Sequence, residues 1–179
     1  YDIVLILSFL TEKHRFKIAF WLSKLDITND TLCIGCGPGV EIGILSEFRS
    51  IANLRFHVYD IEPSRFLTHR LQCKIYNTEF AKSKSLYDNI LLIEVLEHIK
   101  SPMKLIESSS QSLKTDCRMI LTTAINIPQF DHLYNFRLGE IKDILSKCSL
   151  LLESSQVVEH NYFNSNIKAS NELITAIKL

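Results

Sequence analysis

A glycine-rich loop is the clearest chemical signal in the sequence. The chain has only five glycines, and four of them lie close together, at positions 35, 37, 39 and 43. Because glycine has no Cβ, such a loop lets the backbone turn tightly and approach a bound ligand. Gly35, Cys36, Gly37 and Gly39 are therefore candidate ligand-binding positions.

This loop departs from two common phosphate-binding patterns. A dinucleotide fingerprint would need a glycine at position 40, which is Val40 here, and Pro38 removes an N–H donor that a pyrophosphate would use. The Gly-Lys-Ser/Thr ending of a P-loop is missing as well. The loop is therefore better suited to a ligand without a phosphate group.

A carboxylate ends the next apolar run. Asp60 follows Phe56–Tyr59 and precedes Ile61. At the end of a strand, its carboxylate could accept hydrogen bonds from both hydroxyls of a ribose, while Ile61 packs on an adenine. Asp60 also suits the N-cap of a helix that begins near Pro63, and one residue can fill both roles.

A second group of polar residues combines carboxylates with imidazoles. Glu94, Glu97 and His98 are spaced at i, i+3 and i+4, so a helix there would place them on one face. His132 lies in a loop after a later apolar run, which reaches the same edge of a parallel sheet. Because these side chains can move protons, Glu97, His98 and His132 are candidate catalytic residues. Alternatively, His98 is a hydrogen-bonded residue that supports the loop.

Apolar runs of strand length alternate with helix-like segments, and this alternation positions the polar residues. The expected strands of a central sheet are Thr31–Ile34, Arg55–Asp60, Cys73–Tyr76, Asn89–Glu94 and Arg118–Thr123. Several are continuously apolar, as in a parallel sheet covered on both faces. The expected helices are Glu12–Leu25, Met103–Leu113 and Leu138–Cys148. Only a loop separates Leu150–Val158 from Glu172–Lys178, which predicts an antiparallel pair. The whole pattern predicts a doubly wound α/β domain.

Three of these segments together carry a family resemblance. Cys33–Glu41, Asp60 and Asp88–Ile99 resemble, in order and spacing, the class I methyltransferases that use S-adenosylmethionine (SAM). The resemblance covers roughly residues 12–179. It implies a Rossmann-like, seven-stranded and mostly parallel sheet with an antiparallel C-terminal pair. We expect one domain over residues 1–179, in which residues 1–25 form a helical segment that covers the sheet or the cleft.

The resemblance also implies how SAM would bind. SAM would lie over Gly35–Gly39, with its ribose on Asp60 and its methionine end near Glu94. Residues after the third strand contact the adenine in this family, which here are Asn77 and Thr78. The family usually has an acidic residue where this chain has Cys33. A thiol cannot replace that carboxylate, so we expect weaker SAM binding or a substitute, either Glu41 or Glu94.

The carboxylate–imidazole group has a second, narrower resemblance. Glu94, Glu97, His98 and His132 resemble the metal site of the small-RNA 3′-terminal 2′-O-methyltransferases. That resemblance implies a divalent metal, and two carboxylates with two imidazoles suit magnesium, manganese, iron or cobalt. The same segment also resembles small-molecule methyltransferases that bind no metal.

The amino-acid composition indicates which kinds of partner and which cellular compartment to expect. The formal net charge is zero, which disfavours an RNA partner, and the apolar run Ile3–Leu10 is too short to cross a membrane. Five scattered cysteines fit reduced thiols in a cytoplasmic protein. We therefore expect a SAM-dependent methyltransferase that acts on an O or N atom of a small molecule. The alternatives are a metal-dependent RNA-terminus methyltransferase and an inactive SAM-binding partner protein.

Overall fold

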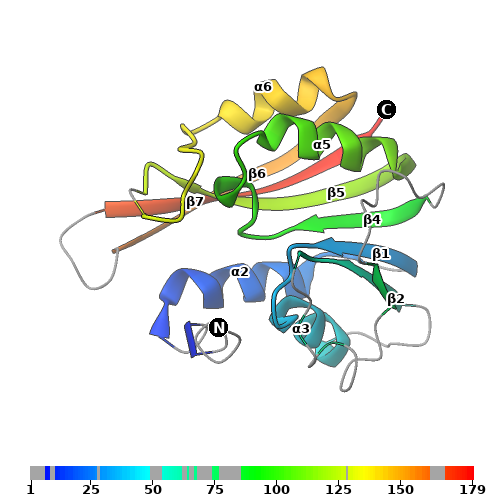
Figure 1. The fold of residues 1–179 in the computed structure, drawn as a ribbon, viewed down its shortest axis with the longest axis horizontal. Coiled ribbons are helices and arrows are strands. Elements are labelled where there is room, and N and C mark those ends of the chain that lie inside the picture. Colours follow the sequence, from blue (N-terminus) through cyan, green and yellow to red (C-terminus); the bar gives the residue numbers. More distant parts are fainter. Residues whose placement is uncertain are drawn as a thin grey trace.

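The computed structural model describes residues 7–8, 11–27, 29–48, 54–61, 64, 67, 74–76, 86–127, 129–161 and 168–179. Within these residues, seven strands form one sheet with helices on both faces (Figure 1). The strands are β1 (Asn29–Ile34), β2 (Leu54–Tyr59), β3 (Lys74–Tyr76), β4 (Tyr87–Leu92), β5 (Leu113–Ile125), β6 (Leu150–Asn161) and β7 (Lys168–Lys178). The helices are α2 (Lys13–Lys24), α3 (Val40–Phe48), α5 (Pro102–Gln111) and α6 (Glu140–Lys147), with one 3-10 turn, η3 (Leu96–His98).

The strand order is β3-β2-β1-β4-β5-β7-β6. The first five strands in this order are parallel, and β7 runs antiparallel to both of its neighbours, β5 and β6. This arrangement confirms the predicted doubly wound sheet with an antiparallel C-terminal pair. Because β1 lies between β2 and β4, successive crossovers leave it in opposite directions, which opens a crevice at the carboxyl ends of β1 and β4.

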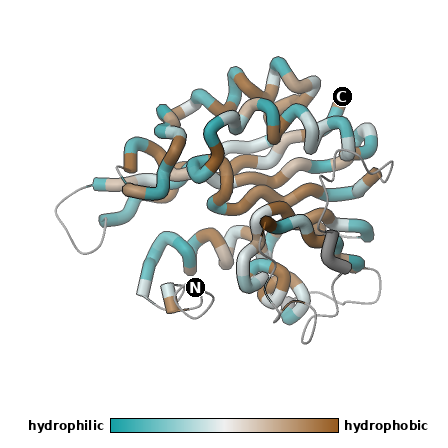
Figure 2. The backbone as a smooth tube through the Cα atoms, viewed as in Figure 1, coloured by the Kyte–Doolittle hydropathy of each residue, from teal (hydrophilic) through white to brown (hydrophobic). Residues whose placement is uncertain are grey.

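Two hydrophobic cores, one on each face, explain the continuously apolar strands. Leu32, Leu92 and Leu121 belong to the core under α5 and α6, whereas Cys33 and Leu91 belong to the core under α2 and α3. Neighbouring residues of one strand therefore enter opposite cores, and the central strands are hydrophobic along their length (Figure 2). No helix in the described part of the chain is long and apolar enough to cross a membrane.

The structure corrects the expected helix after the fourth strand. Strand β4 ends at Leu92 rather than at Glu94, and Glu94 adopts the left-handed conformation with φ of 53°. Only the single turn η3 follows, so Glu94, Glu97 and His98 do not share one face of an α-helix. The chain reverses sharply at Glu94 instead, and this bend decides where each of the three side chains lies.

Candidate functional site

The glycine loop leaves the carboxyl end of β1 and leads into α3. Gly35, Gly37 and Gly39 all have positive φ, at 65°, 49° and 75°, which side chains rarely allow. A Cβ on Gly35 would lie 2.6 Å from Cγ2 of Val95, just after β4. The loop closes on itself through the Gly39 N–H, which donates to the Cys36 carbonyl at 2.8 Å. The glycines thus allow the backbone to turn and allow Gly35 to pack closely against Val95.

Asp60 lies beside this loop, as the sequence predicts. Its Oδ2 accepts a hydrogen bond from the Gly37 N–H at 2.9 Å, and the Gly35 N–H donates to the Tyr59 carbonyl at 2.8 Å. The loop and the end of β2 therefore form one unit. Ile61 follows with 95% of its surface exposed. The other two expected adenine contacts, Asn77 and Thr78, lie outside the described residues.

Glu94 is held in place by hydrogen bonds from two distant strands. Thr122 Oγ1 on β5 donates to Glu94 Oε1 at 2.7 Å, and Asn171 Nδ2 on β7 lies 3.0 and 2.9 Å from the two carboxylate oxygens. The Glu94 N–H in turn donates to Thr122 Oγ1 at 2.9 Å. Only 11% of the Glu94 side chain is exposed. A mostly buried carboxylate, held by hydrogen bonds, therefore lies at the carboxyl edge of the sheet.

Two stacked histidines extend this network. His14 on α2 and His160 on β6 stack with ring centroids 4.2 Å apart, and His14 Nε2 lies 3.9 Å from Glu94 Oε2. Asn171 Oδ1 lies 2.7 Å from His160 Nε2 and must accept, so that nitrogen carries the proton. Burial, together with the neighbouring His160, lowers the pKa of His14 to about 3, so His14 is neutral at pH 7.

Two further acidic side chains lie near Glu94. Glu97 is 1% exposed, and burial and then the Glu94 charge raise its pKa well above the usual value. Burial likewise raises the pKa of Glu41, in the first turn of α3, to about 7. Arg15 on α2 lies near enough to oppose both shifts. These three glutamates, with Arg15 as a nearby cation, favour the binding of a positively charged ligand in the crevice.

His98 and His132 meet Glu97 on the other side of the bend. One ligand-type atom from each of the three residues lies within 4.8 Å of the others, and the two imidazole centroids are 5.1 Å apart. His98 Nδ1 faces the Asp131 carbonyl at 3.1 Å, and His132 Nδ1 faces the Ile127 carbonyl at 3.0 Å. Because a carbonyl oxygen only accepts, Nδ1 of each ring carries a proton, and in a neutral ring the lone pair is then on Nε2.

The structure therefore brings together three of the four expected metal ligands. Glu94 is not in this group, because Thr122 and Asn171 bind its carboxylate on the β5–β7 side. The loop that carries His132 is anchored on η3, since the N–H groups of Leu133 and Tyr134 donate to the Glu97 carbonyl at 2.8 and 3.0 Å. Among the described residues, the group that could hold a metal ion consists of Glu97, His98 and His132.

Sequence patterns missed four residues of this site. His14, Thr122, His160 and Asn171 are on α2, β5, β6 and β7, and each looks like an ordinary residue of its element. The expected antiparallel pairing of β6 and β7 gave no register, so nothing in the sequence placed His160 and Asn171 beside Glu94. Only the folded sheet shows that they belong to the network.

Comparison with known proteins gives a consistent picture. A family model described as a methyltransferase domain matches residues 9–165. Among curated protein sequences, none matches the chain. Solved structures with a similar fold include the N-methyltransferase NodS from Bradyrhizobium japonicum, in complex with S-adenosyl-L-homocysteine (SAH). It has a TM-score of 0.74 and 15% identity, over 93% of this chain and 88% of NodS.

Two further structures widen the range of chemistry on this fold. The mitomycin 7-O-methyltransferase MmcR has a TM-score of 0.67 and 15% identity, over 92% of this chain and 53% of MmcR. The cyclase SpnF has a TM-score of 0.70 and 11% identity, over 90% of this chain and 80% of SpnF. At such identities the likeness concerns the fold, and the cyclase shows that this fold also supports other reactions.

Proposed function

Because the chain belongs to the family of class I SAM-dependent methyltransferases, we propose that it methylates an O or N atom of a small-molecule acceptor. The observation that carries this proposal is the hydrogen bond between the Asp60 carboxylate and the Gly37 N–H. The carboxylate that we propose as the ribose-binding group thus lies beside a glycine loop in which Val95 leaves no room for a Cβ at Gly35. SAM supplies an activated methyl group, so the protein has to position the acceptor and remove its proton.

The amino-acid end of SAM carries an ammonium and a carboxylate group, and the residues that could bind them here differ from those usual in the family. Cys33, at the position of the family's usual acid, is buried in the core under α2 and α3. Of the acids near the crevice, we assign the SAM ammonium group to Glu41 and Glu94, because Glu97 faces His98 and His132. Arg15, which acts on the pKa of Glu41, is the corresponding candidate for the SAM carboxylate.

Removal of the acceptor proton falls to the imidazoles. Burial lowers the pKa of His132, with a smaller effect from His98, so its ring is neutral at physiological pH. A neutral imidazole with a free Nε2 can accept a proton from an alcohol or an amine. We therefore assign the role of general base to His132, with His98 and Glu97 beside it.

Binding and turnover can be tested separately. Titration calorimetry with SAM and with SAH should show binding by the wild type and at least about tenfold weaker binding by Asp60→Ala. Glu107→Ala, on α5 of the opposite face, is the matched control and should bind normally. Transfer of labelled methyl to a panel of small phenols and amines then tests the acceptor class. Binding without transfer to any acceptor would favour an inactive partner protein instead.

One observation favours a second candidate, a metal-dependent methyltransferase of RNA 3′ ends. It is the convergence of Glu97, His98 and His132. In that case a chelator should abolish transfer to a short RNA, and manganese or cobalt should restore it. Transfer to small phenols or amines that chelation leaves unchanged would exclude this candidate.

A further inference from the structure

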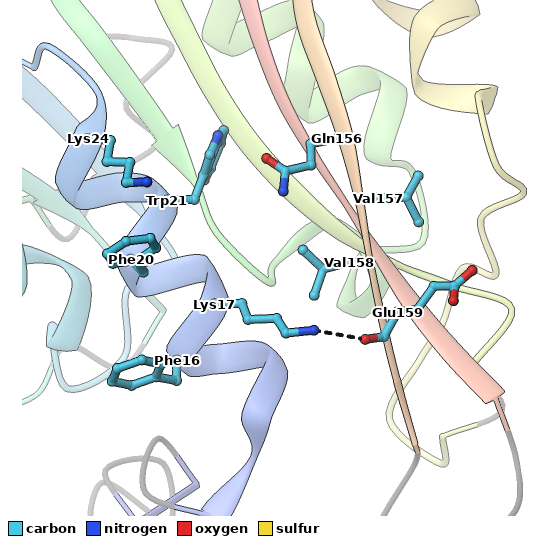
Figure 3. Close-up of a pocket in the computed structure, with 9 residues that line it drawn as sticks. All are labelled: Phe16, Lys17, Phe20, Trp21, Lys24, Gln156, Val157, Val158 and Glu159. Carbon is cyan, nitrogen blue, oxygen red and sulfur yellow. Dashed lines mark hydrogen bonds between the residues drawn. The ribbon is translucent and has the colours of Figure 1, made fainter.

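An open groove lies between helix α2 and strand β6, on the far side of the stacked His14 and His160 from Glu94. Its volume is about 710 Å³, and Figure 3 shows the residues that line it. The lining comes from Phe16, Lys17, Phe20, Trp21 and Lys24 on α2, and from Gln156–Glu159 on β6. In Figure 3, Gln156 and Val158 point toward α2, whereas the side chains of Val157 and Glu159 point away from it.

The exposed face of α2 has a specific composition. Its exposed residues are three lysines and two phenylalanines, namely Lys13, Phe16, Lys17, Phe20 and Lys24. They recur at helical spacing and form a single stripe, which includes no acid. Phe16 and Phe20 are 68% and 57% exposed, and Lys24 Nζ lies 4.0 Å above the Phe20 ring. Within the described residues, none of these lysines pairs with a carboxylate.

The opposite wall of the groove is a strand edge with which no described strand pairs. Strand β6 is the last strand of the sheet order, and among the described strands only β7 pairs with it. Lys17 Nζ donates to the Glu159 carbonyl at 3.3 Å, which indicates that this carbonyl points away from β7. Because strand residues alternate between the two edges, the N–H and C=O of Val157 point the same way. The edge can therefore accept one more strand beside α2.

We propose that this groove binds an acidic, extended segment of a partner protein, which adds to the free edge of β6. Alternate side chains of such a segment would cover Phe16 and Phe20, and its carboxylates would pair with the lysines. The edge carbonyls disfavour a phosphate backbone, and the neutral net charge supplies no wider basic field for RNA. A flat membrane surface would not fill a groove that β6 closes on its second side.

The test uses the whole chain and a labelled peptide of about ten residues that alternates valine and glutamate. Fluorescence anisotropy should show saturable binding that weakens with salt, and a matched valine–glutamine peptide should bind at least about tenfold more weakly. The double variant Lys17→Glu/Lys24→Glu should lose about tenfold in affinity for the acidic peptide. Lys104→Glu/Lys142→Glu, on exposed positions of α5 and α6, is the control and should bind normally.

A second variant tests pairing with the strand edge. Val157→Pro removes one outward N–H while the pairing with β7 remains, so peptide affinity should fall at least about fivefold with little change in melting temperature. Three results would each overturn the proposal: no saturable binding up to about 1 mM peptide, equal binding of the two peptides, or both variants binding like the wild type. Lysine-dependent binding of an oligothymidylate or of phosphatidylserine vesicles, without peptide binding, would assign the groove to those partners instead.

Discussion

Replacing Asn171 by leucine should uncouple Glu94 from the rest of the sheet. Asn171 is fully buried, contacts both oxygens of the Glu94 carboxylate and accepts from His160 Nε2. Leucine nearly preserves the volume but removes every one of these bonds, so Glu94 keeps only its bond from Thr122. Hydrogen bonds to a charged group contribute roughly 1.5–3 kcal/mol each, and Glu94 is partly hydrated. We therefore expect the free energy of unfolding to fall by about 3 kcal/mol.

The same substitution should weaken binding of the cofactor. If Glu94 contacts the SAM ammonium group, its release from β7 should lower SAM affinity about tenfold, or about 1.4 kcal/mol. Urea unfolding and titration calorimetry at pH 7 measure the two effects. Thr175→Val is the matched control, since Thr175 is also buried on β7 but pairs with Ser154. It should cost about 1 kcal/mol of stability and leave SAM affinity unchanged.

Two outcomes would refute this reasoning about Asn171. The first is a leucine variant as stable as the wild type, which would mean that Glu94 gains nothing from β7. The second is equal loss of SAM affinity in Thr175→Val, which would mean that any loosening of β7 disturbs the crevice. A loss of stability with unchanged SAM affinity would separate the two roles and remove Glu94 from the cofactor site.

Three other substitutions test separate parts of the structure. Gly35→Ala should lower the free energy of unfolding by at least about 2 kcal/mol, because Gly35 has a φ of 65° and its new Cβ would contact Val95. Adding Val95→Ala to this variant should recover part of the loss, as measured by urea unfolding. Asp30 accepts hydrogen bonds from Arg55 and His57, and these bonds hold the pKa of its carboxyl below the usual 3.8. The contribution of Asp30 to the free energy of unfolding is therefore complete above pH 3.8 and is lost as the pH falls below that value. Asp30→Asn should therefore lose stability at pH 7 and flatten the acid limb of a urea-midpoint profile, whereas an unchanged profile would contradict the pairing. Glu41, with its pKa raised to about 7, should make SAM affinity increase with pH through neutrality, and Glu41→Gln should remove this dependence in calorimetry.

Local patterns were enough to predict the sheet and one half of the site. The carboxyl ends of parallel strands meet at one edge, so the spacing of Gly35 and Asp60 already implied that they lie together. The bend after β4 was not predictable from spacing. Glu94 takes a left-handed conformation because Thr122 binds both its N–H and its carboxylate. A strand almost thirty residues further along the chain thus decides that an α-helix does not form there.

This chain has Cys33 in place of the usual acid, and it has three acids, Glu41, Glu94 and Glu97, close together. Both features have the same electrostatic explanation. Burial, together with the charge of Glu94, raises the pKa of Glu41 and of Glu97, and a bound cation would favour the ionised form of these acids. Thr122 on β5 and Asn171 on β7 hold the Glu94 carboxylate in place, whereas the family's usual acid would lie on β1 at the position of Cys33. If Glu94 binds the SAM ammonium group, strand β7 of the antiparallel C-terminal pair takes part in holding the cofactor site. Because Glu41 is part-protonated near pH 7, SAM binding should release protons, and SAH, which lacks the sulfonium charge, should release fewer.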